Sequence, residues 1–133
     1  SGFLGNEQIK FWDEIVSKRV ENFKRFQNEV ENNDDFISLN VRHMDLISNF
    51  AMPIVCKNED IFFKYKQKFI DADVEIRPIV AGDMTKQPFY KKYVNKIENC
   101  SNADLVHKNG FYFANNPELT ENELNLLCSL LRQ

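Results

Sequence analysis

Apolar residues recur at spacings of three and four between residues 6 and 30, which predicts one long amphipathic helix. Asn6 is the expected N-cap, since its side chain suits that position and the acidic Glu7 follows in the first turn. The polar run 32–35 then ends the helix. The apolar stripe consists of Trp12, Ile15, Val16, Val20, Phe23, Phe26 and Val30.

The next third of the chain alternates between strand and helix patterns. A strand is predicted within 47–56, and because Pro53 has no N–H to donate, it must be an edge strand or carry a bulge. Asn58 caps a helix that ends at 71–73, and a second strand over 74–77 is closed by Pro78. The predicted buried face of this helix comprises Phe62, Tyr65, Phe69 and Ile70, and its lysines Lys57, Lys64, Lys66 and Lys68 form a solvated face in preference to a binding patch.

The last third begins with an apolar, proline-containing loop over 78–90. Short helices are predicted over 89–97 and from an S-x-x-D cap at Ser101 to Gly110, followed by a strand over 110–114. Thr120 and Glu123 form a capping box that opens the last helix. Its predicted core face comprises Leu124, Leu127, Leu130 and Leu131.

This order of elements predicts an α/β or α+β fold: a small mixed or antiparallel sheet of about three strands, packed with helices and preceded by a long N-terminal helix. We expect one domain over residues 1–133, with 1–31 as a connecting helix and 32–133 as a small α/β domain. The chain opens on Phe3 and Leu4 without an initiator Met, which favours a fragment of a longer protein over a processing boundary.

Composition and charge argue against several classes of function. The net charge of −3 argues against a nucleic-acid partner, and no apolar run approaches the roughly 18–20 residues of a membrane span. No secretory signal precedes the first helix, and three widely spaced cysteines indicate reduced thiols in the cytoplasm. We expect Cys56 and Cys128 to be inert core thiols. His43 and His107 lie far apart in the sequence and are expected to be structural or exposed, so no metal site is predicted.

No catalytic motif is visible, because the four glycines are isolated and neither a C-x-x-C pair nor a nucleophile elbow occurs. Two segments are nevertheless informative: 74–89 (VEIRPIVAGDMTKQPF) and 109–120 (NGFYFANNPELT). They resemble the C-terminal small domain of the DegT-type PLP-dependent sugar-nucleotide aminotransferases. The start of the chain, 2–19, resembles the helix that leads out of that family's large domain, and 18–22 (KRVEN) matches its K-R-x-x-N-like patch. The resemblance covers the chain, but only about the last third of a family member.

The resemblance implies that the Schiff-base lysine and the other PLP-binding residues belong to a large domain, so this chain alone would hold no catalytic residue and bind no PLP. The parent would transfer an amino group from glutamate to a nucleotide-linked keto-sugar, as a cytoplasmic homodimer in deoxy- or amino-sugar biosynthesis, for example of a surface polysaccharide. The loop 77–89 would face the nucleotide-sugar. The substrate-binding residues implied are Arg77, Gly82, Asp83, Lys86 and Gln87.

Three alternatives stay open. The run 81–88 also resembles the PLP-dependent 3-dehydratase branch of the same family, in which Asn commonly stands at the position of Asp83. A small-ligand-binding or dimerisation module without enzymatic activity is the second alternative. The third is an interaction domain whose long N-terminal helix packs with a partner. In the family interpretation, Phe3, Phe11 and Trp12 form a surface that the large domain covers.

Overall fold

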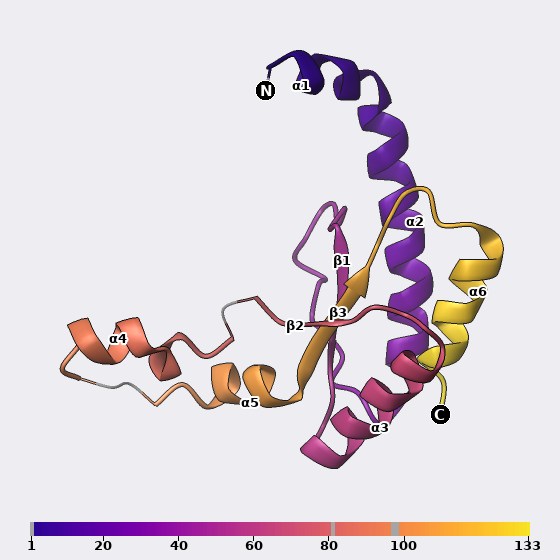
Figure 1. Ribbon diagram of the computed structural model, residues 1–133. Coiled ribbons are helices and arrows are strands. Elements are labelled where there is room, and N and C mark those ends of the chain that lie inside the picture. Colours follow the sequence, from indigo (N-terminus) through magenta and orange to yellow (C-terminus); the bar gives the residue numbers. More distant parts are fainter. Residues whose placement is uncertain (1, 81, 97–98) are drawn as a thin grey trace. The chain divides into compact units, whose positions relative to one another are not determined.

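The computed structural model describes residues 2–80, 82–96 and 99–133 (Figure 1). The described chain forms two compact units. The first unit holds residues 2–34, 38–52 and 114–133, and the second holds 35–37 and 53–113. The division into a connecting helix 1–31 and a domain 32–133 stays a prediction.

The predicted long N-terminal helix is confirmed, but the helical region begins earlier, at Gly2, and one 3-10 turn interrupts its α-helical geometry. It consists of α1 (Gly2–Gln8), the 3-10 helix η1 (Ile9–Phe11) and α2 (Trp12–Glu31). The break has a backbone cause, because Phe11 leaves the α-helical region with φ −101° and ψ 7°. Asn6 lies inside α1 and therefore is not an N-cap, which corrects that expectation.

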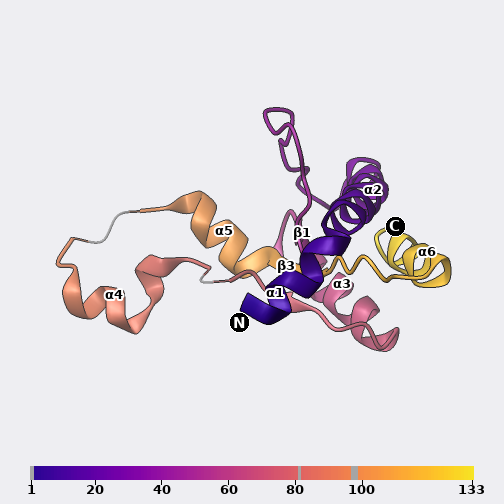
Figure 2. The same ribbon diagram turned by 90° about the horizontal axis from the view of Figure 1, so that it is seen from above.

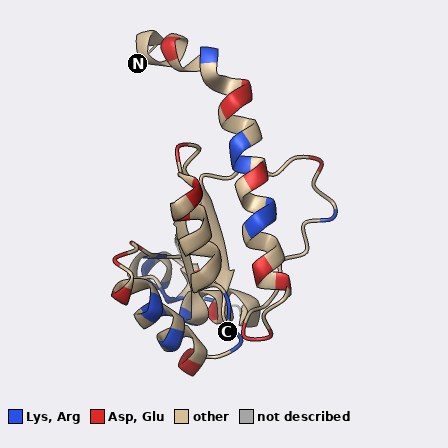
Figure 3. Cartoon of the chain, turned by 90° about the vertical axis from the view of Figure 1, so that its right-hand side faces the viewer, with Lys and Arg blue, Asp and Glu red and all other residues tan. Residues whose placement is uncertain are grey.

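Only the second half of the predicted apolar stripe is buried. Trp12 is 64% exposed, whereas Phe23, Phe26 and Val30 are buried in α2. Figure 3 shows basic and acidic residues alternating along α2. The stripe on α2 thus marks its packing face only from its middle onward, and Phe3 and Phe11 are exposed together with Trp12.

The C-terminal helix α6 (Glu121–Leu130) packs against α2 (Figure 1). Its predicted capping box is confirmed, since Thr120 Oγ1 accepts from the Glu123 N–H and the Glu123 carboxylate accepts from the Thr120 N–H. The predicted core face is confirmed as well, and burial of each leucine side chain contributes about 1.5–3 kcal/mol. That face is Leu124, Leu127, Leu130 and Leu131.

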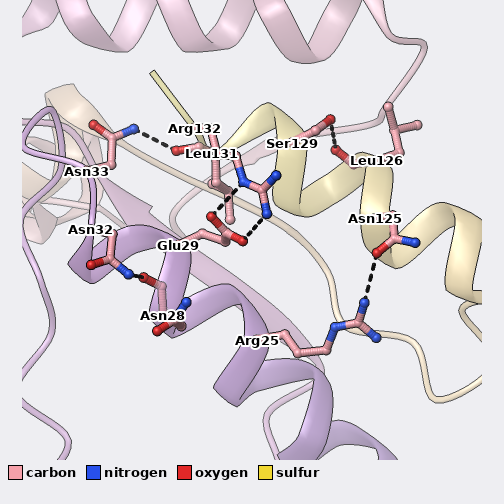
Figure 4. Close-up of polar contacts among 10 residues, drawn as sticks. All are labelled: Arg25, Asn28, Glu29, Asn32, Asn33, Asn125, Leu126, Ser129, Leu131 and Arg132. Carbon is pink, nitrogen blue, oxygen red and sulfur yellow. Dashed lines mark hydrogen bonds and ion pairs between the residues drawn. The ribbon is translucent and has the colours of Figure 1, made fainter.

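Polar contacts between α2 and the C-terminal segment accompany this apolar packing (Figure 4). Arg25 donates to the Glu121 carboxylate at 3.0 Å, and Arg132 donates to Glu29 at 2.6 and 2.9 Å. The Arg132 guanidinium holds the pKa of Glu29 below its usual range. Because these ion pairs lie at the surface, each contributes only about 0–1 kcal/mol, so the apolar contacts dominate the pairing of the two helices.

A three-stranded antiparallel sheet contains β1 (Ala51–Val55), β2 (Arg77–Pro78) and β3 (Gly110–Ala114) in the order β1-β3-β2. The prediction of a strand over 110–114 is confirmed. The prediction for Pro53 is confirmed too, since β1 lies at the edge of the sheet. An edge strand tolerates a proline, which has no backbone N–H to donate.

The predicted strand over 74–77 was wrong, because only Arg77 and Pro78 pair with β3. The cause lies at the end of α3 (Glu59–Asp71), where Asp73 adopts a left-handed conformation with φ 56°. The Val74 N–H then donates back to the Phe69 carbonyl at 3.0 Å. This αL cap ties residue 74 to the helix and delays the strand until Arg77.

Aromatic side chains form the core of the second unit. The predicted N-cap of α3 is confirmed, since the Asn58 side chain accepts from the Ile61 N–H, but Ile70 was assigned wrongly to the buried face and is 52% exposed. The helix turns Tyr65 and Phe69 inward instead. The ring contacts are Phe36–Tyr65 at 4.5 Å, Phe69–Phe111 at 5.4 Å and Phe69–Phe113 at 5.4 Å between centroids.

The segment after β2 carries η2 (Met84–Lys86), α4 (Pro88–Tyr93) and α5 (Ser101–Asn109), and α5 leads into β3 (Figure 2). The helix expected over 89–97 ends at Tyr93, and Ile97 lies outside the described residues. Ser101 was wrongly predicted to cap α5. Cys100 is the N-cap, without a side-chain hydrogen bond, and Asp104 forms ion pairs with lysines instead.

The two expected core thiols are confirmed, since Cys56 and Cys128 are buried and unpaired, whereas Cys100 is exposed. Burial raises the pKa of Cys56 to about 12. Within the described ranges, no cluster of three or more His, Cys, Asp or Glu side chains is arranged to hold a metal ion. No helix formed by these residues combines the length and apolar character needed to cross a membrane.

Asn115, directly after β3, connects three segments of the first unit. Its fully buried side chain donates from Nδ2 to the Arg19 carbonyl of α2 at 3.0 Å and to the Asn49 carbonyl at 3.1 Å. Its backbone N–H donates to the Phe50 carbonyl at 2.8 Å. One residue therefore fixes the start of the C-terminal segment of this unit relative to both α2 and residues 49–50.

We expect Asn115→Ala to lower the free energy of unfolding by about 2–3 kcal/mol, because removal of the amide leaves buried carbonyls without a partner. Urea denaturation followed by circular dichroism measures the change. Asn122→Ala removes an exposed amide of α6 and should change the stability by less than about 0.5 kcal/mol. Equal effects of the two substitutions would contradict the role of Asn115.

Candidate functional site

The candidate site begins at Gly82, which follows β2 and has a positive φ of 51°. A side chain at this position would be strained by the backbone and would overlap the His107 ring of α5. Gly82 thus allows the loop backbone to lie directly against α5. Ala81, part of the run 81–88 considered above, lies outside the described residues.

Asp83 follows Gly82 and is 3% exposed. It is the N-cap of η2: Oδ1 accepts from the Thr85 N–H at 3.0 Å and from the Thr85 hydroxyl at 2.7 Å. The hydroxyl donor, assisted by the Thr85 N–H and the nearby Lys86, lowers the pKa of Asp83. Asp83 is therefore a carboxylate at neutral pH, and it holds the loop in shape.

Lys86 links the loop to α5. Its ammonium forms an ion pair with Asp104, lies 3.9 Å from Asp83, and shares Asp104 with Lys108 of the next helical turn at 2.9 Å. Two acidic and two basic side chains therefore form one network between the loop and the helix. Because the lysine ends are about half exposed, an incoming anion can exchange with these carboxylates.

The network borders a hollow of about 390 Å³ in the second unit. Of the five predicted substrate-binding residues, Asp83 and Lys86 line it, and Gly82 directly precedes Asp83 in the chain. Its other lining residues are Thr85, Lys91, Asn99, Cys100 and Asp104. These dimensions suit part of a small organic ligand, and the ammonium groups suit its anionic end.

Arg77 and Gln87 do not line this hollow. Arg77 lies exposed on β2, where Nε and Nη2 donate to the Glu75 carboxylate at 2.9 and 2.7 Å. Gln87 is the N-cap residue of α4, and its N–H donates to the Met84 carbonyl and closes η2. The structure thus places two of the five predicted residues, Asp83 and Lys86, in the lining of the hollow and sets Arg77 and Gln87 apart from it.

Sequence reasoning missed Asp104, His107 and Lys91 as neighbours of the loop. Asp104 was assigned to a helix cap, and His107 was treated only as one of two isolated histidines. Neither spacing nor composition indicates that α5 folds back onto the loop, because that contact depends on the open backbone position at Gly82.

A comparison with models of protein families finds one match. The family model described as the DegT/DnrJ/EryC1/StrS aminotransferase family matches residues 2–132. No curated protein matches the chain.

Solved structures share the fold. The E. coli GDP-4-keto-6-deoxy-D-mannose-3-dehydratase with bound hydrated PLP is 23% identical with a TM-score of 0.80, over 96% of this chain and 33% of that one. The 3-amino-5-hydroxybenzoic acid synthase is 12% identical with a TM-score of 0.76, over 93% of this chain and 35% of that one. The chain therefore spans about a third of the length of these structures.

We expect Asp83→Asn to lower the thermal midpoint at pH 7, because the neutral amide loses the attraction to Lys86. The pKa of Asp83 is lowered in the folded chain, so its charge stabilises the fold above the unfolded value of about 3.9 and ceases to do so as the pH falls through the lowered pKa. The difference between the two proteins should therefore shrink toward about pH 3. Thermal denaturation at both pH values measures it.

Asp45→Asn alters an exposed loop side chain and serves as the control, with an unchanged midpoint expected at both pH values. A difference for Asp83→Asn that stays constant with pH would show that the charge of Asp83 contributes nothing.

Proposed function

The chain belongs to the DegT/DnrJ/EryC1/StrS aminotransferase family, and on this premise we propose that it is the C-terminal small domain of a PLP-dependent enzyme acting on nucleotide-linked keto-sugars. The reaction is the transfer of an amino group from glutamate in deoxy- or amino-sugar biosynthesis. The match of the family model over residues 2–132 carries the proposal. The length of the chain, about a third of the structures it resembles, supports its assignment as one domain of a larger enzyme.

The residues of this chain do not fit a Schiff-base site for PLP. Such a lysine must be desolvated beside the cofactor, yet in the part of the chain that the structure describes every lysine except Lys68 is exposed. Lys68 is half-buried, with its ammonium 5.5 Å from the centre of the Tyr65 ring. We therefore assign cofactor binding to a large domain of the parent and derive no step of the chemistry within this chain.

The contribution of this chain is substrate binding at the loop 77–89. The Arg77 guanidinium suits a diphosphate or the carboxylate of the amino donor, because its planar fork matches two oxygens at once. Its present partner Glu75 is an exposed carboxylate that such an anion can replace. Gly82 permits close approach of the backbone to a ligand, and Lys86 and Gln87 supply polar contacts.

The 3-dehydratase branch is the alternative within the family. In the sequence, Asp83 departs from the 3-dehydratase branch, which commonly has Asn at this position. Its contacts in the structure do not discriminate between an aminotransferase and a 3-dehydratase. Its Oδ1 accepts from the Thr85 N–H and hydroxyl, and the amide oxygen of Asn accepts from the same donors. A non-enzymatic ligand-binding or dimerisation module is the alternative outside the family's chemistry. We further propose that the parent is a cytoplasmic homodimer.

The isolated 133-residue chain should bind no PLP covalently, because none of its described lysines fits the cofactor. After incubation with PLP and dialysis, we expect a colourless protein and, after borohydride reduction, no lysine adduct by mass spectrometry. A stoichiometric adduct at one lysine would contradict the assignment of the cofactor to another domain. The same treatment of a protein that also contains the family's large domain is the positive control.

In such a two-domain protein, we expect Arg77→Ala to raise KM for the nucleotide-sugar or for glutamate about tenfold, since a hydrogen bond to a charged group contributes about 1.5–3 kcal/mol. Steady-state kinetics with each substrate varied in turn identifies which anion Arg77 binds. Arg132→Ala removes an arginine from another exposed ion pair, with Glu29, and should leave both KM values unchanged. Wild-type kinetics for Arg77→Ala would exclude the loop as the substrate site.

A further inference from the structure

The segment 18–22 and residues 115–118 of the segment 109–120, both singled out in the sequence, meet in the first unit. The Asn115 side chain donates to the Arg19 carbonyl, and Asn22 Nδ2 donates to the Asn116 carbonyl at 3.3 Å. Between them and the preceding helical turns lies a hollow of about 540 Å³. Phe11 and Ile15 supply apolar surface to it, and Lys18, Arg19 and Glu118 supply charge.

The two basic side chains of this hollow differ in their partners. Lys18 forms an ion pair with Glu14 at 2.7 Å, so its charge is already compensated. Arg19 Nε is buried without a hydrogen-bond partner, and no other described residue forms an ion pair with its guanidinium. The Arg19 side chain lines the hollow, so its charge is available to an anion of ligand size that enters there.

We propose that this hollow is a binding site for a small organic anion, in which a carboxylate or phosphate pairs with the guanidinium of Arg19 and an apolar body lies against Ile15. A guanidinium presents parallel N–H donors to either oxyanion, so both groups satisfy the site. The volume lies within the roughly 300–1,000 Å³ of small-molecule pockets. The proposal is independent of the loop 77–89, which belongs to the other unit.

Glu118 also lines this hollow and provides a second way to test the site. Its N–H donates to Asn116 Oδ1 at 3.1 Å, which fixes the turn, and its negative charge contributes to the raised pKa of Lys18 after the larger effect of Glu14. A carboxylate at the border of the hollow repels an anionic ligand. Neutralising Glu118 should therefore strengthen binding, whereas removing the Arg19 guanidinium should weaken it.

The test is a titration of the ¹⁵N-labelled 133-residue chain with benzoate, phenyl phosphate and benzyl alcohol, followed by amide chemical shifts. We expect saturable shifts around Arg19 and Asn116 with benzoate or phenyl phosphate, and the comparison of the two identifies the preferred oxyanion. Arg19→Met should weaken the binding about tenfold or more, because it removes the charged donor. Lys66→Met removes the same charge from exposed α3 and should leave the affinity unchanged.

Two further readouts separate ligand binding from a structural role of Arg19. Glu118→Gln should tighten the binding about two- to fivefold, as expected for a weak repulsion between partly exposed charges. Arg19→Met should not lower the thermal midpoint, because its Nε–H has no partner to lose. No saturable shifts with either anion, equal affinity for neutral benzyl alcohol, or unchanged affinity in both Arg19→Met and Glu118→Gln would overturn the proposal.

Discussion

The buried amide of Asn115 is the constraint on which the arrangement of the first unit depends. A polar side chain with no exposed surface must find acceptors, and Asn115 finds them on Arg19 of α2 and on Asn49 before β1. Apolar packing of α2 on α6 is compatible with several slightly different positions of the helices. The directional hydrogen bonds of Asn115 are compatible with one position of α2. The Asn22–Asn116 bond, one turn further along α2, adds a second fixed point to the same junction.

This junction also explains why Arg19 has an unusual environment. Its backbone carbonyl is held by Asn115, so its side chain emerges at a fixed position beside the turn 116–118. The ion pairs at the other end of α2, between Arg25 and Glu121 and between Glu29 and Arg132, are partly solvated and readily exchanged. The polar groups that determine geometry in this unit are therefore its buried amides, and its surface charges adjust to that geometry.

The loop site differs from this junction, because a backbone conformation and not a buried amide determines its geometry. The positive φ of Gly82 brings the chain against His107, and this approach places Asp83 and Lys86 opposite Asp104. Sequence reasoning identified the loop and its residue types, because proline, glycine and apolar residues together are unusual in a solvated segment. It did not separate Arg77 and Gln87 from the hollow, since their positions depend on strand pairing and on the start of α4.

The sequence by itself determined those features that depend on neighbouring residues along the chain. The capping box at Thr120–Glu123, the Asn58 cap, the leucine face of α6 and the edge position implied by Pro53 all follow from one residue's own donors and acceptors or from helical periodicity. The 3-10 turn at 9–11 and the late start of β2 have local causes too, the backbone of Phe11 and the left-handed Asp73. Tertiary structure decided the hydrogen bonds that join 18–22 to 115–118. These depend on which distant backbone groups are available as partners, and neither spacing nor composition specifies partners almost a hundred residues apart.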